Sequence, residues 1–285
     1  MSRIAYVNGQ YLPHRHASIH IEDRGYQFAD GVYEVVTIVN GKMIDEEGHM
    51  ERLWRSLGEL QIDAPMKAGP LKMIMREVVR RNGVVNGIIY LQITRGVAPR
   101  DHPFPKNTTP ALVMTAKRLS MDKSERTAQA GVNVVTVPDI RWDRCDIKSV
   151  SLLPNVLAKQ AAKDKNAYEA FQVDKNGMVT EGSSTNAWIV NQDGKVITRP
   201  TSNEILAGIT RASLLRELEK KGVEFELRSF TVEELHNARE VFLTSSTSYV
   251  LPVVKVDEHV IGNGNPGSIS VTLRQIYRDF MEDAS

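Results

Sequence analysis

Pairs of asparagine or aspartate followed by glycine separate short strand-like runs along this chain. Four of these pairs, at positions 8–9, 40–41, 176–177 and 193–194, lie between two strand-like runs, and the first two follow the apolar or β-branched runs Ile4–Val7 and Val32–Val39. Such pairs favour the tight turns that join antiparallel strands. The chain is therefore expected to form hairpins, which argues against a doubly wound nucleotide-binding fold.

Apolar residues at helical spacing predict helices between these hairpins. The predicted helices span Gly48–Ile62, Leu71–Arg81, Pro154–Lys165, Thr210–Lys221, Val232–Ala238 and Ser268–Met281. A mixture of hairpins and helices is typical of an α+β fold, here in two parts. The polar stretch Ser120–Gln129 has the composition of a linker. We therefore expect a small N-terminal domain over residues 1–120, a linker over 121–129 and a larger C-terminal domain over 130–285.

Charge and cysteine content narrow the classes of partner. The 285 residues carry 36 basic and 35 acidic side chains, a formal net charge of +1, so nothing favours binding to nucleic acid or to an anionic membrane. The single cysteine, Cys145, excludes an intrachain disulfide and, with no His-Glu-x-x-His motif, argues against a metal site. The chain has no apolar run typical of a signal peptide or a membrane span, so we expect a cytoplasmic protein.

Lys148 is the most unusual charged residue of the chain. Its ammonium group lies between Ile147 and Val150, in a short run that we expect to be a strand. A lysine that loses hydration becomes a better nucleophile, and its amine can form a Schiff base with a carbonyl substrate or with pyridoxal phosphate. The alternative is a lysine whose side chain simply extends to solvent. From this stretch alone both readings stay open.

Other segments carry groups suited to a phosphorylated cofactor or a carboxylate substrate. Thr210 follows a glycine at a helix start, and Thr244–Ser248 is a run of five hydroxyl residues; both suit an anion, or else an ordinary N-cap and a polar turn. Glu181 fits a partner for a pyridine nitrogen or a simple turn residue. Arg100 and His102 could hold a carboxylate or be solvated loop residues.

Five segments taken together resemble the class IV aminotransferases, and among these the bacterial D-amino acid aminotransferases. The resemblance runs in one order from about residue 3 to residue 280 and is carried by residues 24–35, 94–102, 145–149, 180–186 and 208–211. It implies a two-domain fold type IV enzyme that uses pyridoxal 5'-phosphate. Such an enzyme has a small N-terminal α/β domain and a larger, β-barrel-like C-terminal α/β domain, and is usually a homodimer.

The resemblance also implies a role for individual residues. Lys148 would be the Schiff-base lysine, Glu181 the partner of the pyridine nitrogen, and Leu206 the side chain packed on the cofactor ring. The residues around the cofactor phosphate would be Arg52, Ile209, Thr210, Ser245 and Ser246. The residues that bind the substrate α-carboxylate would be Tyr33, Arg100 and His102.

The implied reaction is transamination between a D-amino acid and a 2-oxo acid, such as D-alanine with 2-oxoglutarate to give pyruvate and D-glutamate, by ping-pong kinetics. Two enzymes of the same fold are alternatives, a branched-chain L-amino acid aminotransferase and an aminodeoxychorismate lyase. The Arg100 and His102 pair favours the D-specific enzyme over both. A binding protein that has lost the cofactor is disfavoured, because Lys148, Glu181 and the hydroxyl residues occur together.

Overall fold

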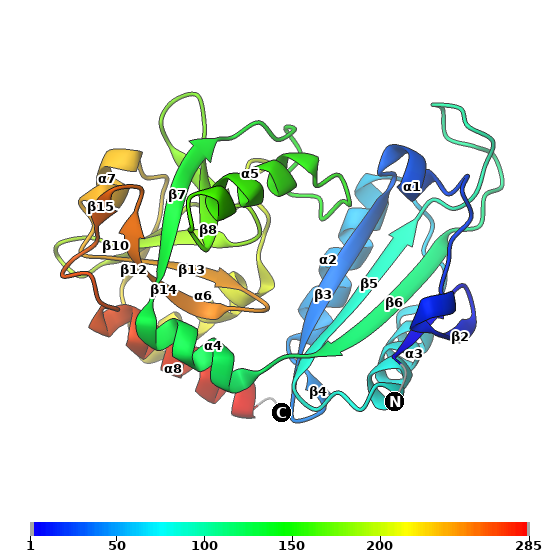
Figure 1. The fold of residues 1–285 in the computed structure, drawn as a ribbon, viewed down its shortest axis with the longest axis horizontal. Coiled ribbons are helices and arrows are strands. Elements are labelled where there is room, and N and C mark those ends of the chain that lie inside the picture. Colours follow the sequence, from blue (N-terminus) through cyan, green and yellow to red (C-terminus); the bar gives the residue numbers. More distant parts are fainter. Residues whose placement is uncertain (1–2, 284–285) are drawn as a thin grey trace. The chain divides into compact units, whose positions relative to one another are not determined.

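The computed structural model describes residues 3–283, which form two compact units. Of these residues, the first unit contains 3–120 together with Ile147–Ser151, and the second contains Met121–Asp146 and 152–283. Each unit combines strands and helices, so the predicted α+β class is confirmed (Figure 1). None of the helices in residues 3–283 combines the length and apolarity that crossing a membrane requires.

The described part of the first unit is built on a six-stranded antiparallel sheet. Its strands lie in the order β2 (Gln10–Pro13), β1 (Ile4–Val7), β6 (Ala111–Arg118), β5 (Gly87–Thr94), β3 (Gly31–Val39) and β4 (Lys42–Met43). The hairpins expected at positions 8–9 and 40–41 are present, and Asn8 and Asn40 adopt the positive φ of tight turns. Helices α2 (Glu46–Glu59) and α3 (Ala68–Arg81) pack their apolar side chains against this sheet.

The segment before β3 contains a short helix that the sequence did not reveal. The 3-10 turn η1 (His14–His16) is followed by α1 (Arg24–Phe28), a five-residue helix within the polar and aromatic stretch. The side chain of Asp23 caps α1 by accepting the N–H of Gly25 (2.8 Å). Because α1 is shorter than two turns, its residues show no helical periodicity.

The second unit contains a nine-stranded mixed sheet within its described residues. The order is β12 (Phe225–Leu227), β11 (Val196–Thr198), β10 (Asn186–Val190), β13 (Glu240–Ser245), β14 (Tyr249–Val256), β7 (Val132–Pro138), β8 (Glu169–Val173) and β9 (Val179–Gly182), with β15 (His259–Val260) paired to β14. The helices are α4 (Met121–Ala130), α5 (Leu153–Asp164), α6 (Ile209–Lys221), α7 (Val232–His236) and α8 (Ser268–Asp283). Large buried side chains, including Phe171, Trp188 and Phe242, fill the core.

Residues 121–129, which were expected to be a linker of irregular structure, form helix α4. The helix is largely polar, and of its residues only Ala128 is fully buried. Its polar side chains attach it to α8, because the Arg274 guanidinium of α8 donates to Ser124 Oγ (3.2 Å) and to the Glu125 carboxylate (3.3 Å). A helix held by polar contacts lacks the apolar stripe by which sequence patterns reveal helices.

Candidate active site

Lys148 lies beside the start of β3, in the segment Ile147–Ser151 that belongs to the first unit. The Tyr33 N–H donates to the Lys148 carbonyl (3.0 Å), and the Val150 N–H donates to the Gly31 carbonyl (3.0 Å). The half-buried Lys148 side chain places Nζ 4.2 Å from the centre of the Tyr33 ring, where a cation is attracted by the π electrons. Two of the predicted site residues are thus in contact.

The strand predicted around Lys148 is wrong. The segment is irregular and forms a single β-bridge, between Ser149 and Val32. It follows a turn at Cys145 and bends again at Val150, so it runs beside β3 for too few residues to form a ladder.

A buried polar row on α2 supports this region. Both oxygens of the fully buried Glu34 carboxylate accept from the Arg52 guanidinium (2.7 and 2.8 Å), and His49 Nδ1 lies 2.7 Å from Oε2. Burial opposes ionisation of Glu34, but Arg52 and His49 outweigh it and hold its pKa well below the usual range. One turn beyond Arg52, Ser56 Oγ accepts the Lys148 N–H (3.2 Å). Glu34 of β3 therefore fixes Arg52, the predicted phosphate ligand, and the same face of α2 anchors the main chain of Lys148 through Ser56.

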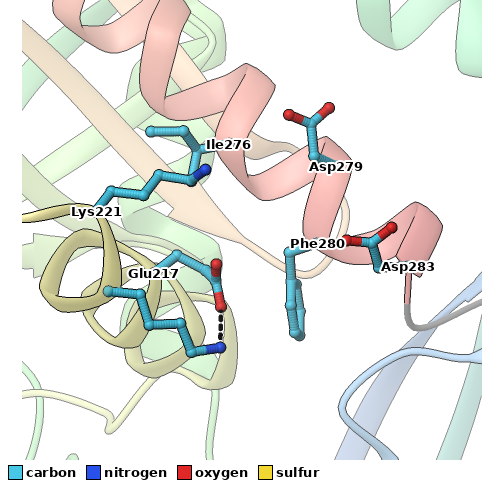
Figure 2. A pocket seen from close by; sticks show the side chains of 7 residues that line it. Glu217, Lys221, Ile276, Asp279, Phe280 and Asp283 are labelled. Atoms are coloured by element: carbon cyan, nitrogen blue, oxygen red, sulfur yellow. Dashed lines mark hydrogen bonds and ion pairs between the residues drawn. The ribbon is translucent and has the colours of Figure 1, made fainter.

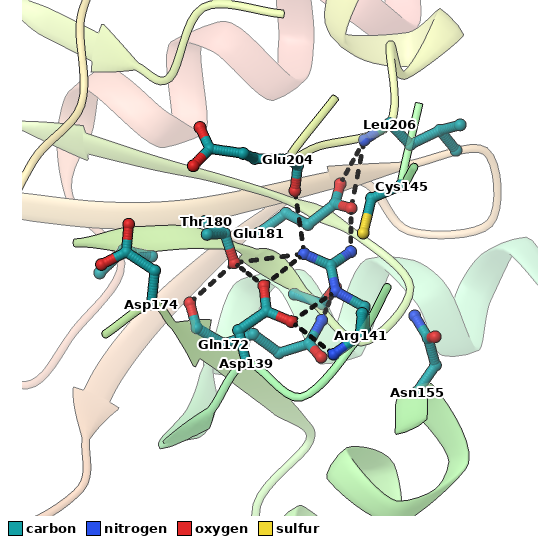
Figure 3. Close-up of polar contacts among 12 residues, drawn as sticks. Asp139, Arg141, Cys145, Asn155, Gln172, Asp174, Thr180, Glu181, Glu204 and Leu206 are labelled. Atoms are coloured by element: carbon teal, nitrogen blue, oxygen red, sulfur yellow. Dashed lines mark hydrogen bonds and ion pairs between the residues drawn. The ribbon is translucent and has the colours of Figure 1, made fainter. Parts of the chain in front are cut away.

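Glu181 is the central acidic group of the second unit. It is buried on β9, where it forms an ion pair with Arg141 and accepts the Leu206 N–H (3.1 Å to either oxygen) (Figure 3). Asn186 Nδ2 donates to Oε2 (3.0 Å). Ionised carboxylates only accept hydrogen bonds, and every one of these groups is a donor. Glu181 is thus a fixed, multiply bonded carboxylate, as a partner for a protonated ring nitrogen must be.

Arg141 is itself fixed by a second acid. Its guanidinium donates to Asp139 through Nε (2.9 Å) and Nη2 (2.7 Å), and Thr180 Oγ1 donates to the same carboxylate (2.7 Å) (Figure 3). Burial opposes ionisation of Asp139, but its hydrogen bonds and ion pair with Arg141 lower its pKa. One guanidinium therefore pairs with two carboxylates, and the Arg211 guanidinium also interacts electrostatically with Glu181.

Asn186 links Glu181 to the start of helix α6. Its Nδ2 donates to the Leu206 carbonyl (3.0 Å) as well as to Glu181. A Cβ at Gly208 would lie 2.0 Å from Asn186 Oδ1, so this close approach requires glycine. Gly208 is the N-cap of α6, without a side-chain cap, whereas Thr210 is the second helical residue and is buried. The N-cap reading of Thr210 is therefore wrong, and the N–H groups of the first turn, which have no partner within the helix, suit an anion.

The hydroxyl run Thr244–Ser248 covers the end of β13 and the turn to β14. It is also connected to Asn186, which pairs with Thr244 across β10 and β13. Thr244 Oγ1 accepts the Trp188 Nε1–H (2.9 Å), and Ser245 Oγ accepts the Ser248 N–H (3.1 Å). Thr244 thus holds the core, Ser245 ends β13, and Ser246 lies in the turn.

Arg100 and His102 lie in an exposed loop of the first unit. Their side chains contact the ring of Phe28, not the Tyr33 and Lys148 pair: the Arg100 guanidinium carbon lies 5.0 Å from its centre and the His102 ring 5.4 Å. The predicted site residues consequently fall into three groups. The first unit contains two of them, one around Lys148 and one formed by Arg100 and His102. The second unit contains the third, around Glu181 and the start of α6.

Two further features contribute no reactive group. Burial raises the pKa of the Cys145 thiol to about 12, so this sulfur is protonated and poorly nucleophilic at neutral pH. A hollow of about 340 Å³ between α6 and α8 is lined by Ile276, Phe280 and five charged side chains, Glu217, Lys220, Lys221, Asp279 and Asp283 (Figure 2). None of these lining residues is a predicted site residue.

The donor set fits pyridoxal phosphate. A half-buried lysine is available for an aldehyde, a fixed carboxylate for a pyridine nitrogen, and a glycine-led helix start with nearby hydroxyls for a phosphate. Several supporting residues escaped the sequence reasoning, namely Glu34, His49, Arg141 and Asn186. The only sequence signal for Arg141 and Asn186 is that they lie in or beside the segments that carry the family resemblance.

Comparison with known proteins gives consistent matches. The sequence profile of the family Amino-transferase class IV matches residues 31–256. The D-alanine aminotransferase of Bacillus licheniformis is 42% identical over 263 residues, 92% of each chain, and that of Staphylococcus haemolyticus is 40% identical over 98% of each chain. Among solved structures, the T.th. branched-chain amino acid aminotransferase with pyridoxamine 5'-phosphate superimposes with a TM-score of 0.90 at 25% identity, covering 98% of this chain and 94% of its own. The Escherichia coli branched-chain enzyme has a TM-score of 0.89 at 21% identity, covering 96% and 93%, and shows the shared fold.

Proposed function

The chain belongs to the class IV aminotransferases, and we propose that it transfers the amino group of D-amino acids to 2-oxo acids with pyridoxal 5'-phosphate as cofactor. D-alanine and 2-oxoglutarate would give pyruvate and D-glutamate. The observation that carries this proposal is the buried Glu181 carboxylate, held by Arg141, Asn186 and the Leu206 N–H. The proposal is also supported by sequence similarity, because the chain is about 40% identical to D-alanine aminotransferases over nearly its whole length.

Each part of the cofactor would be held by a different group of residues. When bound, pyridoxal phosphate supplies an aldehyde for the amine and a protonated ring that accepts negative charge. Lys148 would bind the aldehyde through Nζ, and Leu206 would pack on the ring. Glu181 would keep the proton on the ring nitrogen, because its charge and position are fixed before the substrate arrives. The phosphate would be bound by Arg52, Ile209, Thr210, Ser245 and Ser246.

Lys148 would also act as the base. With its Nζ free, Lys148 would take the proton from Cα of the amino acid. In the second half-reaction the same amine returns a proton to Cα of the product amino acid. A single base that acts on one face of the substrate handles one enantiomer. Tyr33, Arg100 and His102 would bind the α-carboxylate and so decide which face of the substrate Lys148 meets.

The nearest alternative is a branched-chain L-amino acid aminotransferase, which has the same fold. The Arg100 and His102 pair and the D-alanine aminotransferase relatives favour the D-specific enzyme. We expect kcat/KM for D-alanine with 2-oxoglutarate to exceed that for L-leucine by at least about 10²-fold. The measurement follows the two oxo-acid products under identical conditions. A higher value for L-leucine would support the branched-chain enzyme instead, and pyruvate formed from aminodeoxychorismate without any 2-oxo acid would support the lyase.

We propose that the protein forms a homodimer. Helix α5 exposes three apolar side chains on one face, Leu153, Val156 and Leu157, with 70%, 58% and 54% of their surface accessible. A second copy would cover this face. Sedimentation equilibrium at micromolar concentration should give twice the mass of the chain, and Leu157→Lys should shift the equilibrium to the monomer. A wild-type protein that sediments as a fully active monomer would contradict the dimer.

The domain limits and the location of the protein are further parts of the proposal. We propose that residues up to 120 correspond to the small N-terminal domain and that the C-terminal domain starts near residue 130, after α4. Limited proteolysis that cuts within α4, leaving two stable fragments, would support these domain limits, and cuts elsewhere would contradict them.

We also propose a cytoplasmic location. It is supported by the free thiol of Cys145, which fits a reducing compartment.

A further inference from the structure

Helix α1 lies directly against the end of β5 and is rigidly attached there. A Cβ at Gly25 would come within 2.2 Å of Thr94 Cγ2, so the helix approaches the strand as closely as glycine permits. Asp23, which caps the helix, also accepts the Thr94 hydroxyl (2.8 Å). The two ends of this short helix carry Arg24 and Phe28, and both side chains contact the loop that contains Arg100 and His102.

Arg24 binds the main chain of that loop. Its guanidinium is buried, with 3% of the residue accessible, and its Nη1 donates to the Asp101 carbonyl (2.6 Å) while Nη2 donates to the His102 carbonyl (3.1 Å). Its third nitrogen, Nε, donates to Asp30 (2.8 Å). A lysine has one nitrogen where arginine has this planar fork, so it could not make the three contacts together.

Phe28 binds the side chains of the same loop. Its ring is approached by the guanidinium carbons of Arg24 (4.8 Å) and Arg100 (5.0 Å) and by the His102 ring (5.4 Å, tilted by 50°). Arginine is attracted to the face of an aromatic ring, and aromatic rings prefer tilted contacts of this kind. Otherwise Arg100 and His102 are exposed and belong to a loop with several prolines and no regular structure.

A second arginine fixes the other end of the loop. Arg95 donates to Asp30 through Nε (2.7 Å) and Nη2 (3.0 Å), and its guanidinium carbon lies 3.7 Å from the Phe104 ring centre. Asp30 is therefore shared by Arg24 and Arg95. Burial opposes its ionisation, but the two guanidinium groups outweigh it and lower its pKa.

We propose that Arg24 and Phe28 are positioning residues for the substrate carboxylate: Arg24 fixes the main chain of Asp101 and His102, and Phe28 fixes the side chains of Arg100 and His102. The inference rests on the proposed function, in which Arg100 and His102 bind that carboxylate. Neither positioning residue has to touch the substrate. Their effect is to hold the two binding side chains in one arrangement before the substrate arrives, which lowers the ordering cost of binding.

The test compares two D-substrates that differ only in the carboxylate, D-alanine and D-alaninamide, with the holoenzyme. Phe28→Leu keeps the apolar volume and removes the ring. It should raise KM for D-alanine about 10-fold with kcat nearly unchanged, and change kcat/KM for D-alaninamide less than about 3-fold. Arg24→Lys should show the same selectivity. Phe28→Tyr, which retains the ring, should restore the wild-type KM, and Tyr26→Leu, on the exposed face of the same helix with 73% accessible, should change neither substrate.

A direct binding measurement accompanies the kinetics. The His102 ring protons are followed by NMR while propionate, a simple carboxylate, is added to the holoenzyme. Saturable shifts are expected in the wild type, with a dissociation constant about 10-fold higher in Phe28→Leu and unchanged in Tyr26→Leu. Equal losses for both substrates, or an unchanged propionate affinity in Phe28→Leu, would overturn the proposal. Failure of the wild type to transaminate D-alanine, with propionate binding intact, would overturn the proposed function alone.

Discussion

Lys148→Ala is expected to lower kcat for transamination of D-alanine by at least about 10³-fold, because one amine provides both the attachment of the cofactor and the proton transfer at Cα. The Nζ atom over the Tyr33 ring and the main-chain bonds to β3 and Ser56 place this amine, and no other side chain of the segment can replace it. The measurement is the initial rate of pyruvate formation with saturating 2-oxoglutarate and added pyridoxal phosphate.

Lys159 provides a matched control for this experiment. Its Nζ also lies over a tyrosine ring, 4.8 Å from the centre of Tyr168, and forms an ion pair with Glu169 (3.4 Å). Lys159→Ala should retain kcat within about 3-fold, because Lys159 is not one of the predicted site residues; the buried Glu169 loses an ion-pair partner, so the melting temperature is measured as well. A Lys148→Ala enzyme that keeps a tenth or more of the wild-type rate would show that Lys148 is not the base.

Glu181→Gln is expected to lower kcat by about 10²- to 10³-fold while the cofactor still binds. Glutamine has the size of glutamate and can still accept the Leu206 N–H, but it lacks the charge that keeps a ring nitrogen protonated. The substitution also leaves Arg141 with Asp139 as its remaining partner in this ion-pair group, so some loss of stability should accompany the loss of rate. Both kcat and the melting temperature are therefore measured.

Glu240 separates the catalytic effect from the structural one. It is a buried carboxylate of the same unit that accepts the N–H groups of Ile269 (2.9 Å) and Ser270 (2.8 Å) at the start of α8. Glu240→Gln should lower the melting temperature and leave kcat within about 3-fold, since the loss is that of a charged helix cap. If the two glutamine variants lose rate equally, Glu181 has no special role at the cofactor ring.

Features set by neighbouring residues could be predicted from the sequence. The turns at Asn8-Gly9 and Asn40-Gly41 depend on backbone preferences of two residues, and both hairpins form. Helix α4 could not be predicted, because it is held by Arg274, about 150 positions away, and not by an apolar stripe. The strand predicted at Lys148 failed for a related reason, since its neighbour β3 is distant in the sequence and pairs with it at a single bridge.

The reactive residues were easier to predict than the residues that hold them. Lys148 and Glu181 stand out by residue type and context, whereas Glu34, Asn186 and Phe28 have no distinctive chemistry of their own, although all three lie in segments that carry the family resemblance. Their importance arises from contacts between distant segments, such as Phe28 with Arg100 and His102, or Asn186 with Leu206. Neither local propensity nor spacing contains that information.

The most direct test of the central claim is reduction of the holoenzyme with sodium borohydride, followed by digestion and peptide mass spectrometry. Borohydride reduces a Schiff base to a stable secondary amine. The lysine that carries the cofactor therefore retains the added mass of the phosphopyridoxyl group after digestion. The expected result is one phosphopyridoxyl group per chain, on the peptide that contains Lys148. A label on another lysine, or none on a protein that transaminates D-alanine, would contradict the assignment of Lys148.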